Sequence, residues 1–180
     1  MIQWSETHQA IIELVRKFVE AEIKPNLREL EHGDLLPYEI VRKMFAAFGM
    51  RDMAPMRIEK AMSRARARVS AREKNEELPR EERRESGDQV AMQMIPVIEL
   101  SRYCPGMVTA LGVSVGLTAN TIMSRGTPRQ IERWATDLLT LDKIGAWAIT
   151  EPGSGSDAFG SMLSTARRTE GGYLLNGSKT

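Results

Sequence analysis

The residues best suited to chemistry gather in one segment, residues 147–157, which reads WAITEPGSGSD. Thr150 offers a hydroxyl group, and the loop glycines let main-chain N–H groups converge into a nest that binds anions. Ser156 adds another donor, and Trp147 supplies a flat apolar face. These groups suit a phosphate or a ring rich in heteroatoms. Judged by these groups alone, a Gly/Ser-rich turn between two strands is the simpler interpretation.

Other kinds of site are excluded by motif and composition. The segment lacks the Gly-Lys-Ser/Thr ending of a phosphate loop, and its glycine spacing differs from the dinucleotide fingerprint. The single cysteine, Cys104, excludes an intramolecular disulfide, and the two histidines exclude a histidine-rich metal centre. No metal site is predicted. We expect Cys104 to be a small buried hydrophobe, and His8 and His32 to be solvated.

The overall charge is nearly balanced, with 25 Lys and Arg residues against 24 Asp and Glu and a net charge of +1. This balance excludes a protein held to nucleic acid or anionic lipid by bulk charge alone. The uncharged run between Arg102 and Arg125 contains a proline and several glycines and hydroxyl residues, so a buried core helix is favoured over a membrane span. No export signal is recognised, and we expect a soluble, cytoplasmic protein.

The elements that must position the 147–157 segment are mostly helices. Apolar periodicity and capping residues predict helices over residues 5–24, 37–49, 57–78, 89–103 and 108–124, and another that begins at Thr127. Strand-forming residues follow Gly145, so residues 146–150 are predicted to form a strand. A hairpin is predicted from residues 162–168 and 173–175. The sequence therefore predicts a helical domain, residues 1–141, followed by the beginning of a β domain, residues 142–180.

A highly charged segment interrupts the helical part, with 18 charged residues among the 32 positions 57–88. Such density is costly to bury, so we expect a charged helical insertion that forms an exposed arm outside the core. Its narrow apolar stripe consists of Ile58, Met62, Ala65 and Val69. Its basic residues, Arg57, Arg64, Arg68 and Arg72, could share one side of the helix and meet phosphates. The simpler interpretation is a solvated face, and the absence of aromatic residues argues against nucleic-acid binding.

Two blocks of sequence strongly resemble the acyl-CoA dehydrogenase family: TEPGSGSD at residues 150–157 and GYLLNGSK at residues 172–179. This resemblance implies a mainly α fold, in which a helical N-terminal domain of acyl-CoA dehydrogenase type precedes a truncated β domain. It also implies that FAD is the cofactor. In the family, positions equivalent to Trp147, Ile149 and Thr150 line the flavin. Gly155 and Ser156 would complete the cofactor loop, with Ser156 also on the substrate side.

The implied reaction is α,β-dehydrogenation of an acyl-CoA thioester, with hydride transfer to flavin N5 and electron-transfer flavoprotein as acceptor. A homo-oligomer is also implied. The family's catalytic glutamate lies in a C-terminal region, so no catalytic residue is assigned here, and Glu151 is expected to be structural. We therefore expect an N-terminal fragment that is inactive alone. The alternatives are a non-catalytic helical interaction module that uses the 57–88 arm, and a flavin oxidase on the same scaffold.

Overall fold

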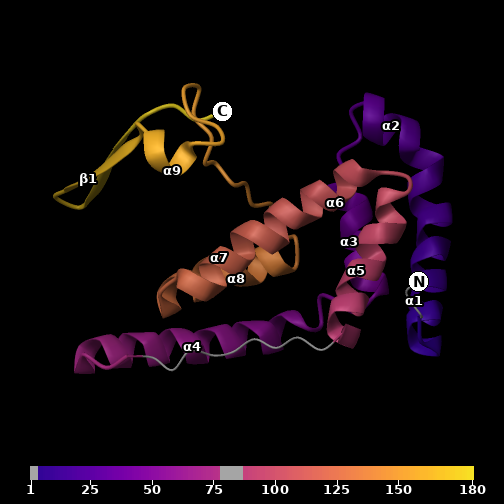
Figure 1. Ribbon diagram of the computed structural model, residues 1–180, viewed down its shortest axis with the longest axis horizontal. Helices are drawn as coiled ribbons and strands as arrows, with labels where there is room; N and C mark the ends of the chain where they lie inside the picture. Colours follow the sequence, from indigo (N-terminus) through magenta and orange to yellow (C-terminus); the bar gives the residue numbers. More distant parts are fainter. Residues whose placement is uncertain (1–3, 78–86) are drawn as a thin grey trace. The chain divides into compact units, whose positions relative to one another are not determined.

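A computed structural model describes residues 4–77 and 87–180 of the chain. These residues divide into two compact units, Met1–Gly145 and Ala146–Thr180, which are described separately below. Within the described residues, helices dominate the first unit and the second holds one two-stranded sheet (Figure 1). This confirms the predicted fold class, mainly α with a small β part. The boundary predicted after residue 141 lies close to this division.

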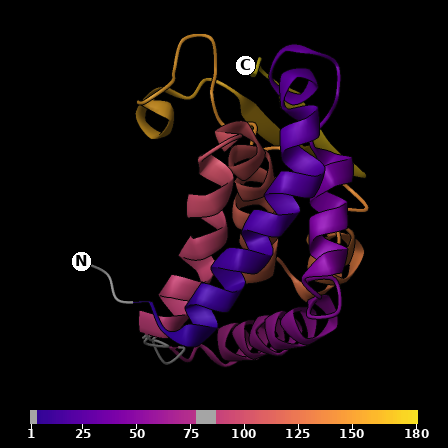
Figure 2. The same cartoon turned by 90° about the vertical axis from the view of Figure 1, so that its right-hand side faces the viewer.

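The first unit is built from a succession of helices (Figure 1). They are α1 (Glu6–Phe18), a π-helical turn η1 (Val19–Ile23), a 3-10 turn η2 (Lys24–Asn26), α2 (Leu27–His32), α3 (Tyr38–Ala47), α4 (Ala54–Lys74), α5 (Gly87–Ser101), α6 (Pro105–Leu111), a π-helical segment η3 (Gly112–Ala119), α7 (Asn120–Arg125) and α8 (Pro128–Leu139). Figures 1 and 2 show α1 lying alongside α5, and these two helices pack closely. Their buried side chains join those of α3, α6 and η3 in one core.

Capping residues set the starts of α1 and α8. The Ser5 hydroxyl accepts a hydrogen bond from the His8 N–H at 3.2 Å, and His8 Nδ1 accepts one from the Ser5 N–H at 3.3 Å. Thr127 and Gln130 form the corresponding pair at α8. The expectation that His8 is solvated is wrong, because its side chain is buried and its ring meets the edge of Trp4. The capping bond folds the imidazole back against the start of the helix.

Helix α4 differs from the predicted exposed arm. Ala61 and Ala65 are buried against Ile131 and Ala135 of α8, so this part of the charged segment belongs to a packed body. Val69, expected in the apolar stripe, is 43% exposed. The prediction of an arm outside the core is therefore wrong for α4. Alanines let two helices approach closely while the long charged side chains around them stay in water.

The end of α4 also differs from the prediction. The helix stops at Lys74, and Asn75 adopts a left-handed conformation with φ of 56° that closes it. Asparagine tolerates this conformation better than most residues, which makes it a common helix terminator. The predicted end at Leu78 lies outside the described residues, as does most of the second half of the charged segment.

The uncharged run forms one long helix, Pro105–Arg125, through α6, η3 and α7. By length and a mean hydropathy of 1.4 it is apolar enough to cross a membrane, and 17% of its most apolar window is buried in the described structure. Composition alone therefore does not exclude a span, contrary to the expectation above. Met107, Val115 and Ala119 on this helix belong to the main core. These contacts favour a helix of the domain, and the absence of a span stays a prediction.

The second unit contains α9 (Ala158–Ser161) and an antiparallel hairpin of β1 (Thr165–Thr169) and β2 (Gly172–Asn176). Thr165 lies opposite Asn176, and the turn uses Gly171 with φ of 82°, which confirms the predicted hairpin. The predicted strand at 146–150 is wrong, because this segment is irregular and its Ile149 N–H bonds to the Trp147 carbonyl at 3.0 Å. Among the described residues it has no partner strand, and an unpaired segment forms no ladder.

Candidate functional site

A buried carboxylate lies at the centre of the second unit. The side chain of Glu151 accepts hydrogen bonds from the Leu163 N–H at 2.7 Å and the Ser164 N–H at 3.0 Å. Lys179 Nζ donates a third, also at 3.0 Å, which is an ion pair. Glu151 has a relative exposure of 6%. The Glu151 carboxylate therefore joins the TEPGSGSD block, called the TEP block below, to the chain before β1 and to the chain after β2.

These donors lower the pKa of Glu151 to about 2. The Ser164 hydroxyl has the largest effect, although it falls short of a full hydrogen bond in this structure, and the Leu163 N–H follows. Desolvation opposes them, and Lys179 adds to them. Such a carboxylate is ionised at neutral pH and is a weak base. Glu151 therefore acts as a structural anchor, and its donors leave it poorly suited to abstract a proton.

Further bonds hold the two sequence blocks together. Besides its bond to Glu151, Lys179 Nζ donates to the Ile149 carbonyl at 3.0 Å. The Thr180 N–H donates to the Thr150 carbonyl, also at 3.0 Å. The end of the GYLLNGSK block thus lies directly against the TEP block. Sequence reasoning found both blocks, but it did not find the role of Lys179, whose partners lie 28 and 30 positions away in the sequence.

The loop of the TEP block closes through reciprocal main-chain bonds. The Glu151 N–H donates to the Ser154 carbonyl at 2.9 Å, and the Ser154 N–H donates to the Glu151 carbonyl at 3.0 Å. Ser154 is buried, and its hydroxyl donates to the Asp157 carbonyl at 3.0 Å. Pro-Gly at the centre of the turn is the sequence signal for this geometry. Ser154 is therefore a positioning residue that the sequence analysis missed.

The five predicted site residues lie within residues 147–156, the stretch that contains Glu151 and the loop closed by Ser154. Trp147 is 41% exposed, Ile149 and Thr150 are half-buried, and Gly155 and Ser156 are exposed. Within the described residues, the hydroxyls of Thr150 and Ser156 make no hydrogen bond to protein. A Cβ at Gly155 would meet no atom within 4 Å. The segment thus offers two hydroxyl groups, one aromatic face and open room to a ligand.

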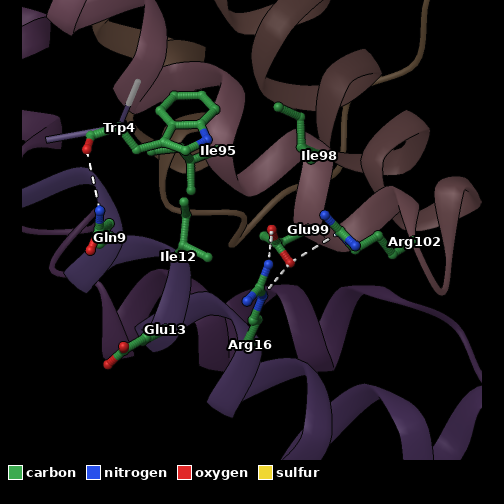
Figure 3. Close-up of a pocket in the computed structure, with 9 residues that line it drawn as sticks. All are labelled: Trp4, Gln9, Ile12, Glu13, Arg16, Ile95, Ile98, Glu99 and Arg102. Atoms are coloured by element: carbon green, nitrogen blue, oxygen red, sulfur yellow. Dashed lines mark hydrogen bonds and ion pairs between the residues drawn. The ribbon is translucent and has the colours of Figure 1, made fainter. Parts of the chain in front are cut away.

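The first unit has a separate pocket between α1 and α5, with a volume of about 350 Å³ (Figure 3). Glu99 is buried there, and its carboxylate accepts two bonds from Arg16, at 2.9 and 3.1 Å. Arg102 Nε lies 3.3 Å from the same carboxylate. The hydrogen bond and the charge of Glu99 raise the pKa of Arg16. This cluster joins α1 to α5, and sequence reasoning missed it because the partners lie 83 residues apart.

The ionised state of Glu151 predicts a pH-dependent structure. Because its pKa is depressed from 4.5 to about 2, the stabilisation is fully present above pH 4.5 and is lost as the pH falls through about 2. We expect the amide chemical shifts of Leu163 and Ser164 to follow this titration in NMR spectra. The Glu151→Gln variant should abolish it, whereas Glu170→Gln at the hairpin turn should not. A titration midpoint at pH 4.5 or above would contradict the role of Glu151 as an ionised structural anchor.

The sequence of the chain matches a known protein family. The family model for the acyl-CoA dehydrogenase N-terminal domain matches residues 5–60 and 78–142. The short-chain specific acyl-CoA dehydrogenase of Mus musculus mitochondria is 29% identical over 178 residues, which cover 99% of this chain and 37% of that protein. The chain thus spans less than two fifths of the length of this curated relative.

Two solved structures have a similar fold. Butyryl-CoA dehydrogenase from Megasphaera elsdenii superposes with a TM-score of 0.67 and 27% identity, covering 99% of this chain and 41% of that one. An acyl-CoA dehydrogenase from Bacillus anthracis, solved in complex with FAD, has a TM-score of 0.62 and 26% identity, covering 98% of this chain and 26% of that one. The match extends over both units of the chain.

Proposed function

Because the chain belongs to the acyl-CoA dehydrogenase family, we propose that this protein takes part in the FAD-dependent α,β-dehydrogenation of an acyl-CoA thioester. The observation that carries the proposal is the bracing of the TEPGSGSD and GYLLNGSK blocks against each other through Glu151 and Lys179. The solved relative with bound FAD supports the choice of cofactor. The names of the relatives support acyl-CoA as the substrate class.

The residues of the second unit fit a flavin in their chemistry. Trp147 would cover one face of the ring, and Ile149 would add apolar contact. The hydroxyls of Thr150 and Ser156, which lack protein partners in the described chain, would donate to ring heteroatoms or substrate. Gly155 would allow close approach of its main chain. When bound, FAD would supply the acceptor for the hydride that leaves the β-carbon of the thioester.

The acid–base part of the reaction is not assigned to this chain. Glu151 is directly adjacent to the proposed site residue Thr150 in sequence, and its low pKa and three donors make it an anchor. We propose a base from outside residues 1–180. Electron-transfer flavoprotein as the acceptor and a homo-oligomeric state remain parts of the proposal that follow from the resemblance. The cytoplasmic location remains a prediction that rests on the absence of a recognised export signal.

The purified 180-residue chain is expected to bind FAD weakly and to catalyse no dehydrogenation. The measurements are quenching of flavin fluorescence on titration, and dye reduction with butyryl-CoA. The physical reason is that five residues on an exposed segment provide few flavin contacts, and no base is available. Absence of any FAD binding would contradict the cofactor proposal. Dye reduction would contradict the proposal that the catalytic base lies outside residues 1–180. Oxygen consumption without dye reduction would favour a flavin oxidase.

A further inference from the structure

We propose that the groove between α4 and α7 binds an oligophosphate group, as in a nucleoside triphosphate or inorganic tripolyphosphate. The groove lies within the first unit and has a volume of about 960 Å³. Small-molecule sites in proteins commonly have volumes of about 300–1,000 Å³. Five cationic side chains line it, namely Arg57, Lys60, Arg64, Arg68 and Arg125. None of its lining residues, all in the described part of the chain, carries a carboxylate.

Helical geometry gathers four of these cations on one face of α4. Each residue advances about 100° around a helix, so positions 57, 60, 64 and 68 fall within an arc of about 80°. The two carboxylates of α4, Glu59 and Glu73, fall on the opposite side. Arg72, which the sequence analysis grouped with these cations, does not line the groove. A concave surface lined by one sign of charge concentrates the potential and attracts ions of the opposite sign.

Hydrogen bonds from two of the arginines hold the groove walls together. Arg68 Nη2 donates to the Gly126 carbonyl at 3.0 Å, beyond the end of α7. Arg57 Nη2 donates to the Asn120 side chain at 3.2 Å, at the beginning of α7. These bonds link α4 to both ends of α7. A guanidinium has five N–H donors, so one bond to the protein leaves Arg68 able to bind phosphate oxygens as well.

The other groups that line the groove also favour phosphate as its ligand. Thr121 and Ser124 lie on its α7 wall; the Ser124 hydroxyl donates to the Thr121 carbonyl at 3.2 Å, and the Thr121 hydroxyl can donate to a phosphate oxygen. Arginine matches the paired oxygens of a phosphate group through two parallel bonds. No aromatic residue lines this described groove, whereas proteins that bind single-stranded nucleic acid stack bases on aromatic rings. These features favour a compact oligophosphate over a nucleic-acid strand.

The groove and the proposed flavin residues lie in different units of the chain. The family model matches residues 5–60 and resumes at residue 78, so Arg64 and Arg68 lie in a segment outside the match. All lining residues belong to the first unit, whereas the proposed flavin residues belong to the second. Arg57, Lys60 and Arg125 lie within the matched ranges, so the groove combines cations from the matched domain with two from the segment outside the match. Failure of this site would leave the proposed dehydrogenase function intact.

The test is a calorimetric titration of the 180-residue chain with sodium tripolyphosphate and, separately, with ATP, at low and high salt. We expect both to bind at low salt and to weaken at high salt. The variant Lys60→Gln/Arg125→Gln should lose about tenfold in affinity, because two charge-assisted contacts are removed. The control Arg66→Gln/Arg129→Gln changes the net charge by the same amount, at residues that do not line the groove. It should keep its affinity within about twofold, because distant exposed charges contribute little.

The outcomes separate the possible ligands. Stronger binding of ATP than of tripolyphosphate supports a nucleotide as the source of the oligophosphate, and equal binding supports a free polyphosphate. Equal losses in the two double variants would overturn the site, because bulk charge would then explain the binding. Binding of a single-stranded oligonucleotide or of polyglutamate without binding of either phosphate compound would also overturn it. Circular dichroism melting of each variant checks that the fold is kept.

Discussion

Replacing Arg16 and Arg102 together by glutamine is expected to lower the free energy of unfolding of the chain by clearly more than the loss of an exposed ion pair does. The Glu99 carboxylate has an exposed fraction of 4% and has both arginines as its cationic partners. Without them a buried negative charge would remain unpaired between α1 and α5. The loss is set by that uncompensated charge, since a buried ion is costly to desolvate. Urea denaturation followed by circular dichroism would measure it.

Two controls separate this effect from a general change of surface charge. Lys43→Gln removes an exposed ion pair with Glu22 and should cost less than about 1 kcal/mol. Adding Glu99→Met to the double variant removes the unpaired charge and should restore much of the lost stability. A loss of stability in the double variant no larger than that of Lys43→Gln, or no recovery on adding Glu99→Met, would show that the cluster does not stabilise the packing of α1 on α5.

The Thr150→Val substitution is expected to weaken FAD binding by about tenfold to a hundredfold. It keeps the shape of the side chain but removes its hydroxyl, and a hydrogen bond to a charged group contributes about 1.5–3 kcal/mol. Thr150 is half-buried beside the anchor, and its carbonyl accepts a bond from the Thr180 N–H, which the substitution leaves in place. Flavin fluorescence titration measures the affinity, and the flavin absorption spectrum reports the change around the ring.

Thr165→Val provides the matched control, because Thr165 lies in β1 of the same unit, is exposed and is outside the proposed site. It should leave FAD affinity unchanged within about twofold, as expected for a surface substitution. An unchanged flavin spectrum and affinity in Thr150→Val would remove Thr150 from the proposed site. Equal losses in both variants would show that the second unit responds to any added methyl group.

The sequence by itself determined the features that depend on neighbours along the chain. Thr127 and Gln130 satisfy each other at the start of α8, and Gly171 permits the turn of the hairpin. Each of these structures involves main-chain groups only a few residues apart. The family was also evident from sequence, since the TEPGSGSD and GYLLNGSK blocks are contiguous. The site residues within these blocks remain predictions that the substitutions above test.

The tertiary structure alone decided which faces are covered and which distant groups are paired. Residue spacing showed that α4 has a regular pattern, but the choice of Ala61 and Ala65 as its buried residues depends on α8. The same holds for Glu99, whose neutralisation by Arg16 requires α1 and α5 to pack together. Lys179 reaches Glu151 only because the hairpin returns the chain. Burial and ion pairing are set by residues distant in sequence, and composition and periodicity carry no information about which distant elements will meet.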